Sequence, residues 1–176
     1  MLIFRKNFSI NYFLLFSIIL IILMIFLRKI AIFLFFTIIT AIFTYINYHI
    51  KFPFDLSPVL FLSLIISREY SFLFSIAFII VTGIVPMVFA GGSFDHTTLF
   101  YLSIIFLVNF VNTKIRFLNP IIAFLVLILA HHIMAFFGSL SFGNNPKKEF
   151  INLFLKIFVD FNYVMLFCNI VIGLMK

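Results

Sequence analysis

The chain has 176 residues, of which 65% are hydrophobic and 10% are charged, whereas a soluble domain has about 25% charged residues. So few polar side chains cannot cover the surface of a water-soluble fold. The composition therefore predicts an integral membrane protein with the lipid bilayer as its solvent. The formal net charge of +7 does not indicate nucleic-acid binding, because the basic residues are scattered singly or in pairs between apolar runs and form no patch.

Seven apolar runs follow one another along the chain and leave few residues between them. Crossing about 30 Å of hydrocarbon takes roughly 20 helical residues, and the runs are continuous rather than alternating, which disfavours a strand barrel. We therefore predict an all-α fold, a polytopic transmembrane helical bundle with a six-span core and one extra N-terminal helix. The runs are Ile10–Leu27, Ile30–Tyr48, Pro58–Ser67, Ser71–Ala90, Thr97–Val111, Asn119–Phe137 and Phe150–Leu174.

The first run begins after Arg5–Lys6 and ends at Arg28–Lys29. A signal peptide has the same basic start, but this run is long and lacks a small-residue cleavage site. We therefore interpret residues 1–29 as a signal-anchor-like helix. Residues 30–176 then form one six-span membrane domain.

The third run is short for a transmembrane helix. Ser57 is a good N-cap and Pro58 suits the first helical position, so a helix is predicted to start there. About ten residues later Ser67, Arg68 and Glu69 interrupt the apolar run. The run is either a half-helix that turns back or a short full crossing surrounded by protein, and we favour the crossing.

The fourth run contains a proline and a series of small residues. Pro86 has no N–H to give to the Thr82 carbonyl and its ring crowds that turn, so a kink is predicted. Ser71, Ser75 and Thr82 lie on one helical face, and Gly83 follows. Small residues at this spacing let a second helix approach closely, so we predict a helix-packing face that includes Ser71, Ser75 and Gly83.

The distribution of basic residues predicts an orientation. Alternating the last six spans places Lys51, Lys147 and Lys148 on one side and the loop Gly91–His96 with them. The other side then holds Arg28, Lys29, Arg68, Lys114, Arg116 and Lys176. The positive-inside bias assigns this second, larger set to the cytoplasm. The first helix fits less well, since it leaves Arg5 and Lys6 outside.

Polar residues within spans are the usual indication of a transport path or an active site. Asp160 lies inside the last run with Lys156 one turn before it, a spacing that favours an intrahelical ion pair near an interface. The alternative is that Asp160 faces the bundle interior and binds a cation or hydrogen-bonds to a partner helix. We favour the ion pair.

His131 and His132 lie near the middle of the sixth run. Adjacent helical residues point about 100° apart, so the two rings cannot chelate one ion from the same face. We expect one of them to hydrogen-bond to another helix as a neutral imidazole. A metal site would need further ligands such as Asp95 or His96, and we expect neither a metal nor a cofactor.

The loop from Gly91 to Thr98 is the densest polar segment. Gly91 is predicted to end the preceding helix in a left-handed turn, and Asp95 to cap the next helix, with Thr97 as a competing cap. The functional alternative is that Asp95 and His96 contact a small solute or a partner at the outer mouth. The sequence has no nucleophile elbow, zinc-protease motif or phosphate loop, so we do not expect an enzyme.

The stretch from Pro53 to Val111 resembles the rod-shape-determining MreD family of bacterial inner-membrane proteins. The resemblance rests on P-F-D-L at Pro53–Leu56, the basic turn at Arg68–Glu69, the small residues, the glycine turn Gly91–Gly92 and the helix that opens with His96. The six-span layout from Ile30 onward also matches. The chain departs from the family where the small-residue series fails at Ile79, where an acidic residue is missing before the glycine turn, and in the extra first helix.

The same layout is similar to the substrate-binding S components of energy-coupling-factor vitamin transporters. Those proteins carry an Ala-x-x-x-Ala motif on an early helix, and neither of the first two runs contains it. The resemblance to MreD implies a non-enzymatic scaffold subunit of a cell-envelope or cell-shape complex in the plasma (inner) membrane, with other membrane subunits as partners. The alternative is a small-solute uptake subunit that docks on a transporter coupling subunit. A small enzyme acting on lipid is a third alternative.

Overall fold

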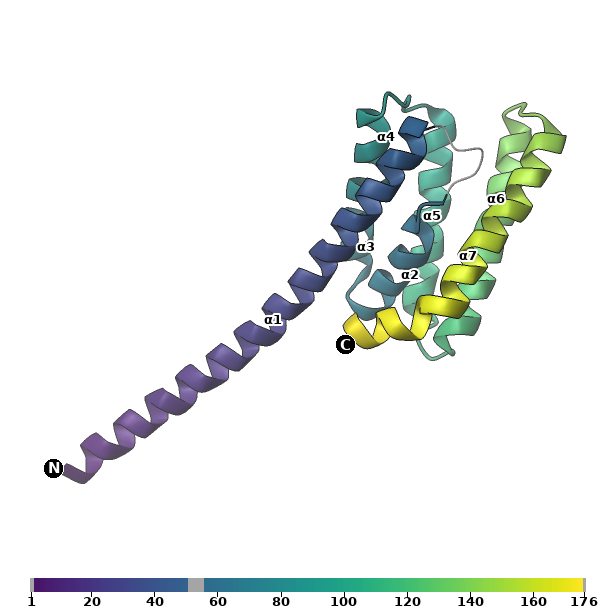
Figure 1. Ribbon diagram of the computed structural model, residues 1–176. Helices are drawn as coiled ribbons and strands as arrows, with labels where there is room; N and C mark the ends of the chain where they lie inside the picture. The colour runs from purple at the N-terminus through teal and green to yellow at the C-terminus, as the bar shows by residue number, and fades with distance from the viewer. Residues whose placement is uncertain (1, 51–55, 176) are drawn as a thin grey trace.

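The computed structural model describes residues 2–50 and 56–175, and their regular structure is entirely helical (Figure 1). In that part of the chain five helical segments are long and apolar enough to cross a membrane: Leu27–Ile50, Phe72–Phe89, His96–Lys114, Pro120–Ser141 and Pro146–Met175. The prediction of an all-α fold is thus confirmed for the described residues, and five helices of this length and composition are compatible with a multi-pass membrane protein. The count of six core spans is not confirmed, because the third apolar run forms a helix below spanning length.

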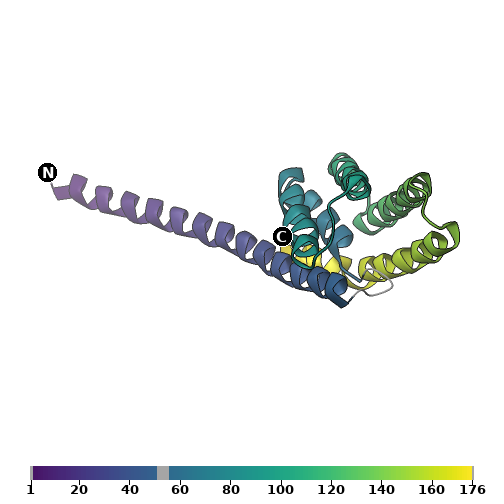
Figure 2. The same cartoon turned by 90° about the horizontal axis from the view of Figure 1, so that it is seen from above.

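The elements are α1 (Leu2–Ile50), α2 (Val59–Glu69), α3 (Phe72–Ile79), the π-helical turn η1 (Ile80–Ile84), α4 (Val85–Phe89), α5 (His96–Lys114), α6 (Pro120–Ser141) and α7 (Pro146–Met175). α3, η1 and α4 follow one another without a gap and form one span. Seen from above, α1 lies along one side of the bundle and α5 and α6 along the opposite side (Figure 2).

α1 is one continuous helix, where the sequence predicted two helices divided at Arg28–Lys29. The reason is local: no glycine or proline occurs between Leu2 and Ile50, and arginine and lysine are good helix formers. Its 49 residues extend about 74 Å at 1.5 Å per residue, more than twice the roughly 30 Å thickness of the hydrocarbon layer. The first half of α1 extends alone from the bundle (Figure 1).

α2 is the central helix of the bundle. Every residue from Leu60 to Ser67 is buried, and the helix contacts α1, α3, α5, α6 and α7. Its 11 residues cover about 16 Å, roughly half the hydrocarbon thickness. α2 therefore fills one half of the bundle only, and protein rather than lipid surrounds it.

Hydrogen bonds from α5 fix the position of α2. Asn109 donates from Nδ2 to Ser63 Oγ (3.0 Å), and Asn112 donates from Nδ2 to the Leu64 carbonyl (2.7 Å) and to Ser67 Oγ (2.8 Å). All four side chains that take part are fully buried. In a bilayer such bonds between helices add to van der Waals packing as a source of association. α5 thus sets both the depth and the rotation of α2.

The backbone before α2 is also held by side chains. The Leu56 amide donates to Asn47 Oδ1 of α1 (3.4 Å), and the Leu56 carbonyl accepts from the Tyr163 hydroxyl of α7 (2.8 Å). The predicted capping by Ser57 does not occur: α2 begins at Val59, its N-cap is Pro58, and this cap makes no side-chain hydrogen bond. Ser57 lies one residue too early to accept from the first free amides of the helix.

The span α3–η1–α4 changes its hydrogen-bonding pattern just before Pro86, where the sequence predicts a kink. The helix passes through the π-helical turn η1 immediately before the proline, and such turns accommodate a missing i→i−4 bond. Ser71 caps α3 by accepting from the Phe74 amide (3.4 Å). Gly91 has φ 82° and ends the segment in the predicted left-handed turn.

Arginine, lysine and tyrosine side chains gather at one end of the bundle, which we call the basic end. Tyr70 donates from its hydroxyl to the Lys29 carbonyl (3.2 Å), and Arg68 donates from Nη2 to the Arg116 carbonyl (2.7 Å). Arg116 in turn donates to the Ser67 carbonyl (2.9 Å). Of the other residues used for the orientation and for the family resemblance, Lys51, Lys176 and the positions Pro53, Phe54 and Asp55 lie outside the described residues.

Replacing Asn112 by leucine tests the attachment of α2 to α5. Asn112→Leu removes two hydrogen bonds and leaves Ser67 Oγ without this donor in an apolar interior. We therefore expect the free energy of unfolding in mixed micelles to fall by about 1–2 kcal/mol. The matched control is Ser103→Ala, on the exposed side of the same helix. Equal unfolding free energies for the two variants would contradict this role of Asn112.

Candidate functional site

A cavity of ≈ 200 Å³ lies between the helices at the end opposite to the basic end. Its floor is the start of α2, where Ser57, Val59 and Leu60 line it. α1, α5 and the α3–α4 span continue well past the start of α2 (Figure 1). The cavity therefore occupies the space that the short central helix leaves unfilled.

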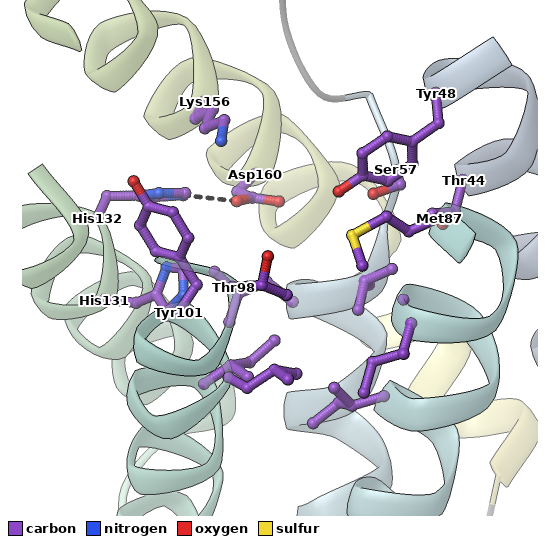
Figure 3. A pocket seen from close by; sticks show the side chains of 17 residues that line it. Thr44, Tyr48, Ser57, Met87, Thr98, Tyr101, His131, His132, Lys156 and Asp160 are labelled. Atoms are coloured by element: carbon purple, nitrogen blue, oxygen red, sulfur yellow. Dashed lines mark hydrogen bonds and ion pairs between the residues drawn. The ribbon is translucent and has the colours of Figure 1, made fainter. Parts of the chain in front are cut away.

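The lining of the cavity divides into an apolar part and a polar part. The apolar part comes from α2, η1, α4 and α5, and includes Leu60, Ile84, Met87, Leu102 and Ile105. The polar part comes from α1, α5, α6 and α7, and its side chains converge from these four helices (Figure 3). Its members are Thr44, Tyr48, Thr98, Tyr101, His131, His132, Lys156 and Asp160.

His132 and Asp160 are joined across the polar wall. His132 Nε2 on α6 lies 2.7 Å from Asp160 Oδ2 on α7, and the two side chains are 6% and 9% exposed (Figure 3). This distance is typical of a charge-assisted hydrogen bond between a ring N–H and a carboxylate. The pair both links α6 to α7 and places two titratable groups beside the cavity.

The predicted ion pair between Lys156 and Asp160 is not formed in the structure (Figure 3). Asp160 takes the alternative position considered from the sequence, facing the bundle interior and bonding to a partner helix. The reason is the difference in burial: Asp160 is buried against α6, whereas Lys156, one turn earlier on α7, is only half-buried. A carboxylate buried this deeply needs a partner at its own depth.

His131 and His132 point in different directions, as their adjacency predicts. His132 bonds to Asp160, whereas His131 lines the cavity with its Nδ1 buried and without a hydrogen-bond partner. In the part of the chain that the structure describes, no three His, Cys, Asp or Glu side chains come close enough to hold a metal ion.

The other predicted contact residues, Asp95 and His96, are not part of the cavity lining. Asp95 caps α5, because its Oδ1 accepts from the Thr98 amide (2.9 Å) and the Thr98 hydroxyl (3.1 Å). The hydrogen bond from the Thr98 amide holds the pKa of the Asp95 carboxyl below its usual range. The His96 ring packs edge-on against Phe142, with centroids 5.2 Å apart. Thr98, three residues after Asp95, is the residue of this segment that reaches the cavity.

The predicted helix-packing face is used within the chain. Ser71 caps α3, Ser75 is fully buried in the bundle, and Gly83 lines the cavity. A Cβ atom added at Gly83 would meet no atom within 4 Å, so the glycine is not required there by close helix packing. These three residues therefore do not present one common face to a partner.

Tyr48, Thr44 and Tyr101 are cavity residues that the sequence did not single out as a site. The two tyrosines lie near span ends, where a tyrosine is ordinarily assigned to the membrane interface. Thr44 belongs to a buried threonine series with Thr37 and Thr40, which a helical spacing of three and four residues reveals. That spacing was the one available sign that this face of α1 points inward.

A double-mutant cycle tests the pair that links α6 and α7. His132→Leu leaves the Asp160 carboxylate buried without this partner, so we expect it to lower the free energy of unfolding by roughly 3–5 kcal/mol. Asp160→Leu leaves the imidazole without this partner, and the double variant removes both polar groups. The double variant should therefore lose clearly less free energy of unfolding than the two single variants lose together. The measurement is denaturant unfolding in mixed micelles. Strictly additive losses would mean that the 2.7 Å contact contributes nothing.

No protein-family model matches this chain, and no curated protein or solved structure is similar to it. The functional argument therefore depends on the chemistry of its own cavity.

Proposed function

We propose that the chain is a membrane subunit that binds a small solute in the cavity, as a substrate-binding component of an uptake system in the plasma (inner) membrane. The observation that carries this proposal is the convergence of eight polar side chains from four helices on one cavity within an otherwise apolar bundle. Ligand sites combine apolar walls with a few placed polar groups, and ionisable residues at membrane depth are costly unless they serve a function.

The location of the cavity supports the same proposal. It lies at the end of the bundle opposite to Arg68, Arg116 and Lys29. The positive-inside bias assigns the basic end to the cytoplasm, and the cavity then lies on the outer side. A solute-capturing subunit needs its site on the side from which the solute arrives.

Filling the cavity from Gly83 is the direct test. Gly83→Leu places a side chain into the cavity without a clash at Cβ, so we expect the fold to persist and solute binding to be lost. Gly173→Leu is the matched control, since Gly173 also has no neighbour within 4 Å of an added Cβ but lies on the exposed side of α7.

Native mass spectrometry after incubation with a deproteinised cell extract gives the readout. We expect the original chain and Gly173→Leu to retain the same small solute and Gly83→Leu to retain none. If no variant retains a solute, or all retain it equally, the cavity is not a binding site.

A second proposal is the scaffold role that the resemblance to MreD implies, and the length of α1 supports it. The first half of this helix extends beyond the bundle, where this chain provides no covering helix (Figure 1). An apolar helix without neighbours from its own chain is available to partner subunits of a cell-envelope complex.

Photo-crosslinking in cells tests the scaffold proposal. A photoreactive residue at Leu15 or Ile18, both exposed on the first half of α1, should give discrete crosslinks to other membrane proteins. The control position is Ile122, which is exposed to a similar extent on α6. Crosslinks to lipid alone at all three positions would remove the scaffold proposal.

A further inference from the structure

Lys156 provides a positive charge at the polar wall of the cavity. Its ammonium group points toward the cavity (Figure 3). Among the residues that the structure describes, no carboxylate lies within ion-pair distance of it, since the ion pair recorded there joins His132 to Asp160. A half-buried ammonium that is not part of an ion pair attracts an anion, because its charge is screened less than at an open surface.

Asp160 does not cancel this charge by direct contact. Its Oδ2 lies 2.7 Å from His132 Nε2, so this carboxylate bonds to α6. Among the described residues that line the cavity, Lys156 is the one lysine or arginine, and it forms no ion pair.

His131 adds a hydrogen-bonding ring to the same part of the cavity lining as Lys156. Of its two ring nitrogens, only Nδ1 is buried without a partner. A buried N–H without an acceptor is rarer in proteins than a buried lone pair without a donor, so the neutral ring places its proton on Nε2. With its proton on Nε2, the ring of His131 is a hydrogen-bond donor in the lining of the cavity. The hydroxyl groups of Tyr101 and Thr98 line the same part of the cavity.

The rest of the cavity accepts an apolar group. Leu60, Ile84, Met87, Leu102 and Ile105 form this part, and the whole cavity is ≈ 200 Å³ in volume. One ammonium and neutral donors suit a singly charged carboxylate, whereas a phosphate is usually held by several cations or by backbone amides. The volume excludes a long acyl chain from full enclosure.

We propose that the cavity binds a small amphipathic monocarboxylate, with its carboxylate on Lys156 and His131 and its apolar part against α2, α4 and α5. This inference rests on the proposed solute-binding function and names the chemical class of the solute. Lys156 supplies the charge that separates an acid from its neutral analogue, and the apolar wall supplies the affinity that both share.

Matched acid and amide probes test the inference on the full chain in detergent. We expect phenylacetate and hexanoate to raise the melting temperature, and phenylacetamide and hexanamide to need about tenfold higher concentration for the same shift. Lys156→Met keeps the side-chain stem and removes the charge, so it should abolish the preference for the acid. Lys156→Arg should retain the preference, and Lys147→Met, on an exposed residue at the start of the same helix, should leave it unchanged.

Several outcomes would overturn the carboxylate inference. These are equal shifts with acid and amide, an undiminished acid preference in Lys156→Met, or no shift with either acid at millimolar concentration. Displacement of phenylacetate by oleate would contradict the small size of the ligand and indicate a lipid-derived carboxylate. If acid and amide shift the melting temperature equally and Gly83→Leu suppresses both shifts, the solute-binding function stands and only the carboxylate inference is removed. Equal shifts that persist in Gly83→Leu would remove both.

Discussion

A protein in a bilayer has to satisfy its backbone hydrogen bonds with its own groups. This requirement is most demanding at α2, because this helix is too short to cross the hydrocarbon layer. A helix of 11 residues cannot bring both of its ends to water across about 30 Å of hydrocarbon. One end of α2 therefore lies inside the protein. Asn47 and Tyr163 take up the backbone polar groups of Leu56 before it, and Asn109 and Asn112 bond along its length.

The cavity is a direct consequence of this arrangement. The longer helices continue past the start of α2, and nothing in the described chain fills the space between them. The polar groups that face this space come from helices that are apolar on their lipid side, so each helix carries its polar residues on one inward stripe. Polar groups on such a stripe have to bond to one another, because burying them singly costs free energy. His132 and Asp160 meet this condition by forming a hydrogen-bonded pair.

The sequence was sufficient for the features that depend on local chemistry. The apolar runs located the helices, Asp95 caps α5, Gly91 makes the left-handed turn and a π-helical turn precedes Pro86, because each of these follows from residues within one or two turns. The continuity of α1 through Arg28–Lys29 was missed for a reason that is also local. Charged residues suggested a membrane boundary there, but a charge does not end a helix when no glycine or proline accompanies it.

The features that depend on helix rotation were less accessible from the sequence. Asp160 has Lys156 one turn away and His132 28 residues away, and only the rotation of α6 against α7 decides between them. The small residues of the fourth run were predicted to form a helix-packing face, and the structure buries Ser75 within the bundle and places Gly83 in the cavity lining. Periodicity identifies a stripe on a helix, but it does not say whether that stripe faces the chain's own bundle or another protein.

The two halves of α1 pose different physical problems. The second half packs on the bundle through Thr37, Thr40 and Thr44, whose small side chains allow close approach; the Thr37 and Thr44 hydroxyls bond back to the preceding turn. The Lys29 carbonyl accepts from Tyr70 at the basic end, so the edge of the bundle passes through the middle of this helix. The segment before it is as apolar as a span and lies beyond that edge. Because water does not stabilise such a surface, either lipid reached by a change of helix direction at Arg28–Lys29 or a second protein has to cover it.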